Sequence, residues 1–96
     1  MIGKIRRALE ERLSAADVQV ADESSAHVGH AGAREGGHFR VRVVSEQFRG
    51  RSPLARHRMV YEAVGTLMGH GIHALAIDAQ TPEEAARGSG AAENVS

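Results

Sequence analysis

Apolar residues near the start of the chain recur every three or four positions. They are Ile2, Ile5, Leu9 and Leu13. This is the period of one helix face, so we predict an amphipathic helix over residues 2–13. Ser52-Pro53 and Thr81-Pro82 predict two further helix starts. The hydroxyl of the serine or threonine can accept a hydrogen bond from an unpaired backbone N–H group of the first turn, and proline fits that turn.

An apolar stripe predicts that the second of these helices continues to Met68. Its members are Leu54, His57, Val60, Tyr61, Val64, Leu67 and Met68. Gly69 and Gly71 follow the stripe and are typical of a helix end. Because His57 lies in phase with the apolar residues, we interpret it as a structural, hydrogen-bonded core residue rather than a ligand.

Three other segments have the pattern of strands. They cover Val18–Asp22, His38–Val44 and Ile72–Ile77. In the second strand, apolar residues alternate with His38, Arg40 and Arg42, which predicts one buried face and one basic face. The element order predicts an α+β fold, in which a three-stranded mixed sheet has its first two strands antiparallel and its helices on one face.

The connection between the first two strands is long and rich in glycine. It contains His27 and His30. Connections of this length without regular structure are usually functional or disordered, and the residues alone leave both interpretations open. The chain becomes rich in glycine and serine again near its end, so we expect one domain over residues 1–86 and a disordered tail over residues 87–96.

Composition narrows the possible chemistry. The 96 residues include six histidines and no cysteine, which excludes disulfides, thiolate catalysis and metal sites built on the chain's own sulfurs. No HExxH, Walker or Ser-His-Asp pattern stands out, so we expect no enzymatic activity. The N-terminal segment carries Glu10 and Glu11 and no apolar run, so we expect no export signal, no membrane span and a cytoplasmic location.

The net charge of zero conceals a basic stretch between His38 and Arg58. Against one acid, Glu46, the stretch holds six arginines: Arg40, Arg42, Arg49, Arg51, Arg56 and Arg58. Such a cluster is either a solvated face or a nucleic-acid-binding surface. Only three aromatic residues are present, which argues against base stacking.

Five motifs, in this order along the chain, carry a family resemblance. They are His38-Phe39-Arg40-Val41-Arg42-Val43-Val44-Ser45, Phe48-x-Gly50, Arg56-His57-Arg58-x-Val60-Tyr61, Ile72-His73-Ala74-Leu75-Ala76 and Thr81-Pro82-Glu83-Glu84. Together they resemble the BolA family over roughly residues 2–86. The resemblance implies a fold akin to the class II KH domain.

The resemblance also implies a partner and a cofactor. BolA-like proteins pair with monothiol glutaredoxins and share a 2Fe–2S cluster, to which the glutaredoxin side brings its cysteine and a glutathione thiolate. The BolA side brings the histidine of the Ile-His-Ala-Leu motif, which is His73, and a loop residue, which is His27 with His30 as the alternative. The isolated chain is expected to hold no cluster.

The function expected from this resemblance is non-enzymatic assembly or trafficking of iron–sulfur clusters. A second hypothesis is a DNA-binding regulator of cell shape and stress responses that uses the six arginines. A third is a KH-like domain without a ligand of its own. Ala85 stands where the family usually has Trp, so we expect the last helix to dock less firmly.

Overall fold

The computed structural model describes residues 1–24 and 37–87 of the chain. The elements are α1 (Ile2–Leu13), β1 (Asp17–Asp22), β2 (Gly37–Val44), the 3-10 helix η3 (Glu46–Phe48), α2 (Pro53–Val64), the 3-10 helix η4 (Gly65–Leu67) and β3 (Ile72–Gln80). Residues 82–87 form a further helix. The predicted tail began at Arg87, which is the last residue of this helix, and residues 88–96 lie outside the described residues. The predicted loop with His27 and His30 also lies outside them.

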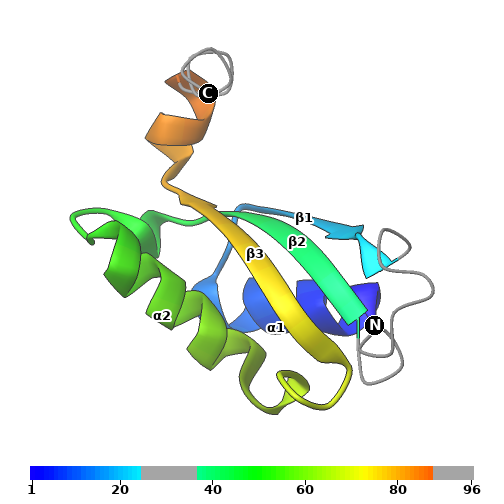
Figure 1. The fold of residues 1–96 in the computed structure, drawn as a ribbon. Coiled ribbons are helices and arrows are strands. Elements are labelled where there is room, and N and C mark those ends of the chain that lie inside the picture. Colours follow the sequence, from blue (N-terminus) through cyan, green and yellow to red (C-terminus); the bar gives the residue numbers. More distant parts are fainter. Residues whose placement is uncertain (25–36, 88–96) are drawn as a thin grey trace.

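The three strands form one mixed sheet in the order β1-β2-β3. β1 runs antiparallel to β2, with Val18 opposite Val43, and β3 runs parallel to β2, with Leu75 opposite Phe39. Consequently β2 and β3 begin at the same end of the sheet, and the helix over 82–87 lies beyond the other end (Figure 1). The predicted fold class and the predicted antiparallel pair are confirmed.

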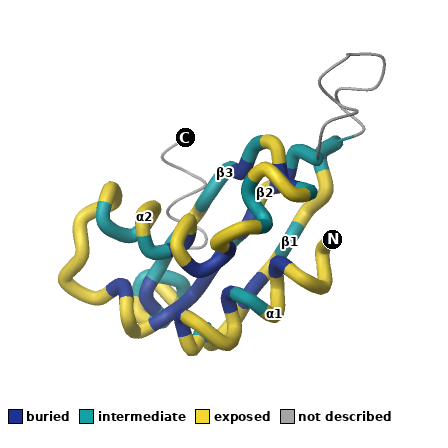
Figure 2. The backbone as a smooth tube through the Cα atoms, turned by 90° about the horizontal axis from the view of Figure 1, so that it is seen from below, coloured by how far each residue is buried: buried dark blue, intermediate teal, exposed yellow. Residues whose placement is uncertain are grey.

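The core lies between the sheet and the two long helices, in the interior that Figure 2 shows in dark blue. Its members include Ile5, Leu9 and Leu13 of α1, Val18, Phe39, Val41, Val43 and Leu75 of the sheet, Phe48, and Val60, Ala63 and Val64 of α2. All the sheet residues in this set point to one face, because side chains alternate along a strand. The other face carries the polar residues Gln19, Arg40, Arg42 and Asp78.

The phase of α2 differs from the prediction. The helix ends at Val64, four residues before the predicted end, and Gly65 follows it with φ of 55°. Leu54 and Tyr61 are exposed rather than buried, with 62% and 42% of their surface accessible. Val60 and Val64 of the predicted stripe are buried together with Ala63, so the stripe was right at these two positions and wrong at the exposed ones.

His57 is exposed, and its interpretation as a core residue is therefore wrong. Arg56 takes the inward place one turn before Val60, with its guanidinium 6.0 Å from the centre of the Phe48 ring. A long side chain can bury its aliphatic part while its charged group forms an ion pair. A prediction that places only apolar residues in the core therefore misses such a position. β3 also extends to Gln80 rather than Ile77, because its ladder with β2 continues as far as Val44.

The same substitution at a buried and an exposed leucine tests this packing. Leu9 is fully buried on α1, whereas Leu54 is exposed on α2. We expect Leu9→Ala to lower the free energy of unfolding by about 2–5 kcal/mol. We expect Leu54→Ala to change it by less than about 0.5 kcal/mol. Urea denaturation measures both, and a large loss for Leu54→Ala would contradict the phase of α2.

Candidate metal centre and arginine network

Two histidines meet where β2 and β3 begin. His38 follows Gly37 at the start of β2, and His73 follows Ile72 at the start of β3. The centres of their rings are 5.2 Å apart and the rings are tilted by 51°. His73 is exposed and His38 is half-buried, so the pair opens to the surface at this end of the sheet.

A break in the strand register produces this contact. Gly37 lies opposite Ile72, but His38 lies opposite Ala74, so His73 has no partner residue on β2. Gly37 is closely packed: a Cβ there would lie 2.5 Å from the Phe39 ring and 2.8 Å from Ser24 Oγ. Such an irregularity redirects a side chain without ending the strand.

The backbone of His38 is held on the β1 side as well. Its N–H donates to Ser24 Oγ at 2.9 Å, and its carbonyl accepts from the Glu23 N–H at 2.7 Å. The Ser24 N–H donates in turn to Asp22 Oδ1 at 2.8 Å. The hydrogen bonds from Ser24 lower the pKa of the Asp22 carboxyl. The start of β2 is therefore fixed by the end of β1.

The structure places some of the predicted site residues and not others. His73 lies exposed at the start of its strand, as the sequence predicts, whereas His27 and His30 lie outside the described residues. His38 was missed as a site residue, although its position at the start of a strand was visible in the sequence. Only the parallel pairing of β2 with β3 reveals that it contacts His73. Within residues 1–24 and 37–87, no three His, Cys, Asp or Glu side chains form a metal-binding group.

Arg56 joins α2 to the C-terminal helix at the opposite end of the sheet. Its guanidinium binds both oxygens of Glu84, at 2.7 and 3.1 Å, and donates to the carbonyl of Ala79 at 3.2 Å. Its Nε donates to the carbonyl of Arg51 at 2.9 Å. Only 14% of the Arg56 side chain is exposed, so this two-pronged pair is better shielded than a surface salt bridge.

Glu84 also completes the predicted capping box. Its carboxylate accepts from the Thr81 N–H at 2.9 Å, and Thr81 Oγ1 accepts from the Glu84 N–H at 3.1 Å. Arg56 and Thr81 together lower the pKa of Glu84 to about 2. The start of the last helix is thus held by an ion pair and a cap.

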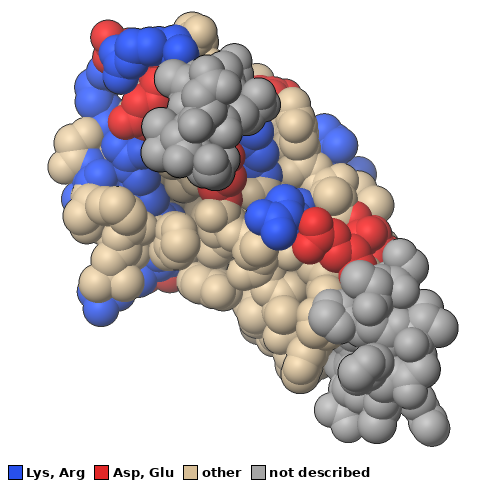
Figure 3. Space-filling model, turned by 45° about the horizontal axis from the view of Figure 1, so that its top comes forward, with Lys and Arg blue, Asp and Glu red and all other residues tan. Residues whose placement is uncertain are grey.

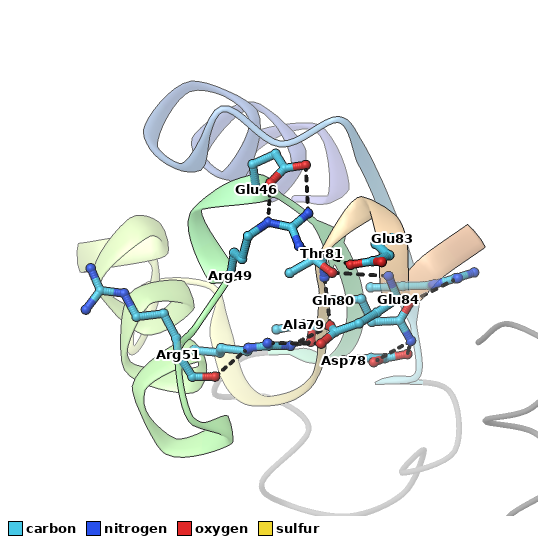
Figure 4. Close-up of polar contacts among 11 residues, drawn as sticks. Glu46, Arg49, Arg51, Asp78, Ala79, Gln80, Thr81, Glu83 and Glu84 are labelled. Carbon is cyan, nitrogen blue, oxygen red and sulfur yellow. Dashed lines mark hydrogen bonds and ion pairs between the residues drawn. The ribbon is translucent and has the colours of Figure 1, made fainter. Parts of the chain in front are cut away.

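Three other arginines of the basic stretch contact polar groups of the same chain. Arg49 lies between Glu46 at 2.8 Å and Glu83 at 3.1 Å (Figure 4), and these contacts lower the pKa of Glu46 and raise that of Arg49. Arg40 pairs with Glu23 at 2.9 Å, and Arg42 donates to Gln80 Oε1 at 3.2 Å.

Two arginines of the six remain available to a ligand. The guanidinium groups of Arg51 and Arg58 make no hydrogen bond or ion pair with any described residue, and Figure 4 shows Arg51 pointing away from the network. Carboxylates interrupt the basic side chains on the face that Figure 3 shows. The charge excess of the sequence is therefore mostly balanced within the fold.

A family model described as "BolA-like protein" matches residues 9–84 of the chain. The chain belongs to the BolA family. Solved structures agree: the BolA domain of SufE1 from Arabidopsis thaliana superposes with a TM-score of 0.74 at 41% identity, covering 85% of this chain and 92% of that one. The predicted family and α+β fold are confirmed.

Curated relatives differ in length and in the names they carry. BolA-like protein 1 of Mus musculus is 46% identical over 83% of this chain and 57% of its own length. SufE-like protein 1, chloroplastic/mitochondrial, of Arabidopsis thaliana is 39% identical over 84% of this chain and 24% of its own length. The DNA-binding transcriptional regulator BolA of Vibrio cholerae is 38% identical over 83% of this chain and 74% of its own length. This chain thus spans little more than half of the first relative and a quarter of the second.

The location of this BolA-family chain stays a prediction, since the names of relatives include chloroplastic and mitochondrial proteins. The structure adds one related observation. None of the helices in the described part of the chain has the length and apolar character needed to cross a membrane.

The ion pair at Glu84 predicts a pH dependence of stability. Its pKa of about 2 lies below the ordinary value of 4.5, so the ionised carboxylate stabilises the fold above pH 4.5 and the effect is lost as the pH falls toward 2. We expect Glu84→Gln to lower the free energy of unfolding at pH 7 by about 1 kcal/mol, because the pair is partly exposed. We also expect a shallower loss of stability between pH 5 and pH 3.

The matched control is Glu83→Gln, which removes the more exposed contacts to Arg49 and Arg87. It should change stability less than Glu84→Gln at pH 7. Urea midpoints measured across the pH series compare the two variants. Equal effects would show that the Arg56–Glu84 contact adds nothing beyond a surface pair.

The number of available arginines predicts how strongly any DNA binding by the basic stretch depends on salt. Each phosphate neutralised contributes about −0.9 to the slope of log K against log salt concentration. Arg51 and Arg58 should thus give a slope of about −2, whereas all six arginines would give about −5. Fluorescence anisotropy of a labelled duplex measures the wild type against an Arg51→Ala, Arg58→Ala double variant. A steep slope that survives in the double variant would show that the other arginines leave their partners.

Proposed function

We propose that this protein is a non-enzymatic accessory protein that shares a 2Fe–2S cluster with a monothiol glutaredoxin, and so takes part in iron–sulfur cluster assembly or delivery. One observation carries the proposal. An exposed imidazole, that of His73, lies at an open end of the sheet beside a second imidazole, in a chain without cysteine. Imidazole is a good ligand for iron, and its exposure leaves room for ligands from another molecule.

The need for a partner follows from the donor count. Two iron atoms of a 2Fe–2S cluster require four protein or cofactor ligands, usually thiolates, and histidines replace two of them in Rieske-type centres. The described residues offer no third ligand near the two histidines. A partner thiol and glutathione would complete the set.

Histidine ligation would also change the properties of the 2Fe–2S cluster. Neutral imidazoles in place of thiolates leave less negative charge on the cluster, which raises its reduction potential. Because a histidine must lose its proton to bind, cluster retention weakens in acid. These are properties of a site from which a cluster can be passed on.

The family relationship supports an iron–sulfur role through BolA-like protein 1 and the SufE-like protein. The Vibrio cholerae relative carries the name of a DNA-binding regulator. We rank DNA binding second for this chain, because four of the six arginines are held by contacts within the fold. The expected cytoplasmic setting and the absence of enzymatic activity remain part of the same proposal.

His73→Ala is the direct test. We expect the variant to give less than a tenth of the wild-type visible circular dichroism when mixed with a monothiol glutaredoxin, glutathione, iron and sulfide. The reason is that the variant removes an imidazole the cluster needs without removing a buried group. Size-exclusion chromatography with detection in the visible range reports whether the cluster elutes with both proteins.

His57→Ala is the matched control, since His57 is also exposed but lies on α2 beside Ile77 and Ala79. It should assemble the cluster like the wild type and unfold at a similar temperature. If His73→Ala gives the wild-type spectrum, the cluster does not bind through this residue. If wild-type protein gives no shared cluster with the glutaredoxin, the proposed function itself fails.

A further inference from the structure

The two outer strands of the sheet differ in how their free edges are covered. β3 lies beside α2 (Figure 1), and two side chains of that helix reach the edge of the strand. The Tyr61 hydroxyl donates to the Leu75 carbonyl at 3.4 Å, and the Arg56 guanidinium donates to the Ala79 carbonyl at 3.2 Å. These contacts satisfy edge carbonyls of β3 and obstruct the approach of another strand.

The hydrogen bonds of β1 show which of its backbone groups face outward. The Glu23 N–H donates to the His38 carbonyl at 2.7 Å, so this residue points its backbone groups toward β2. Because every second residue of an antiparallel strand does so, residues 19 and 21 also bond to β2, whereas Val18 and Val20 point outward. The Arg6 guanidinium, which donates to the Val18 carbonyl at 2.7 Å from outside the sheet, agrees with this assignment.

Most of the β1 edge is left without a hydrogen-bond partner. Within residues 1–24 and 37–87, no group bonds to the Val18 N–H or to the N–H and carbonyl of Val20. The Val20 side chain packs half-buried against the core, so apolar surface adjoins these polar groups. Outward-facing N–H and carbonyl groups along a strand are a template for one more strand. The edge therefore fits an extended segment of another chain.

The charges along this edge select the kind of segment. Asp17 and Asp22 lie exposed at the two ends of β1, and neither forms an ion pair with a described residue. Arg6, the cation at this edge, binds a backbone carbonyl instead. An antiparallel second copy centred on Val20 would place Asp17 of each copy opposite Glu23 of the other, and like charges directly opposite each other are destabilising. A segment with basic residues at both ends meets no such penalty.

We infer that the edge of β1 is a docking surface for an extended, basic segment of a partner protein, which adds to the sheet as a fourth strand. Its basic residues lie opposite Asp17 and Asp22, and an apolar residue between them lies opposite Val20. The inference goes beyond the proposed function, because it involves the long side of β1 and no histidine or cluster.

The test uses the full chain and the peptide acetyl-Lys-Thr-Val-Thr-Val-Lys-amide, whose lysines are spaced as the two aspartates are. At saturating peptide, amide hydrogen exchange followed by NMR should slow by about fivefold or more at Val18 and Val20. The amides of Gln19 and Ala21, which already donate to β2, should change by less than about twofold. The peptide with glutamate in place of both lysines is the matched control, and it should bind about fivefold or more weakly.

Charge variants of the chain separate the role of the aspartates from general attraction. The double variant Asp17→Asn, Asp22→Asn should weaken binding of the lysine peptide by about threefold or more at low salt. Asparagine keeps an oxygen that accepts from the Ser24 N–H, so the end of β1 is preserved. Glu10→Gln with Glu11→Gln removes the same charge from exposed positions on α1 and should stay within about twofold of the wild type.

Four results would overturn the inference. They are no binding of the lysine peptide, equal binding of the two peptides, binding without protection of Val18 and Val20, and an equal loss of affinity in both double variants. Protection of Val18 and Val20 that grows with protein concentration in the absence of peptide would assign the edge to a second copy and also overturn it. None of these measurements involves cluster assembly, so failure here is distinguishable from failure of the proposed function.

Discussion

The parallel pairing of β2 with β3 is the constraint on which the rest of the molecule depends. Parallel strands need a long crossover, and here η3, α2 and η4 provide it while covering the core face of the sheet. The pairing brings residues 37–44 beside residues 72–80, although the chain separates them by a whole helix. The contact between His38 and His73 and the ion pair between Arg56 and Glu84 both follow from it, because they lie at opposite ends of this ladder.

The two ends have different chemistry for a physical reason. At the starts of β2 and β3 the imidazole rings of His38 and His73 lie 5.2 Å apart beside the break in register. At the far end, Arg56 and Glu84 share a shielded ion pair that holds the last helix against α2. Charges placed there stabilise the fold, whereas at the other end the side chain of His73 is exposed.

The arginines illustrate how local sequence and folded surface can disagree. Counted along the chain, the stretch from His38 to Arg58 has a strong positive excess. In the fold, three further carboxylate partners come from outside the stretch: Glu23 precedes β2, and Glu83 and Glu84 follow β3. A basic segment is therefore a weak argument for nucleic-acid binding until the acids that fold against it are known.

The sequence by itself determined the order of the elements, the alternation that buries Phe39 and Val41, the capping box at Thr81 and the family. These depend on local periodicity and on residues close together in the chain. Only the tertiary structure decided the inward face of α2, where Arg56 rather than His57 packs toward the core because its charge meets Glu84. Only the structure joined His38 to His73, because strand pairing sets distances between residues far apart in sequence, and one register break decides which side chains touch.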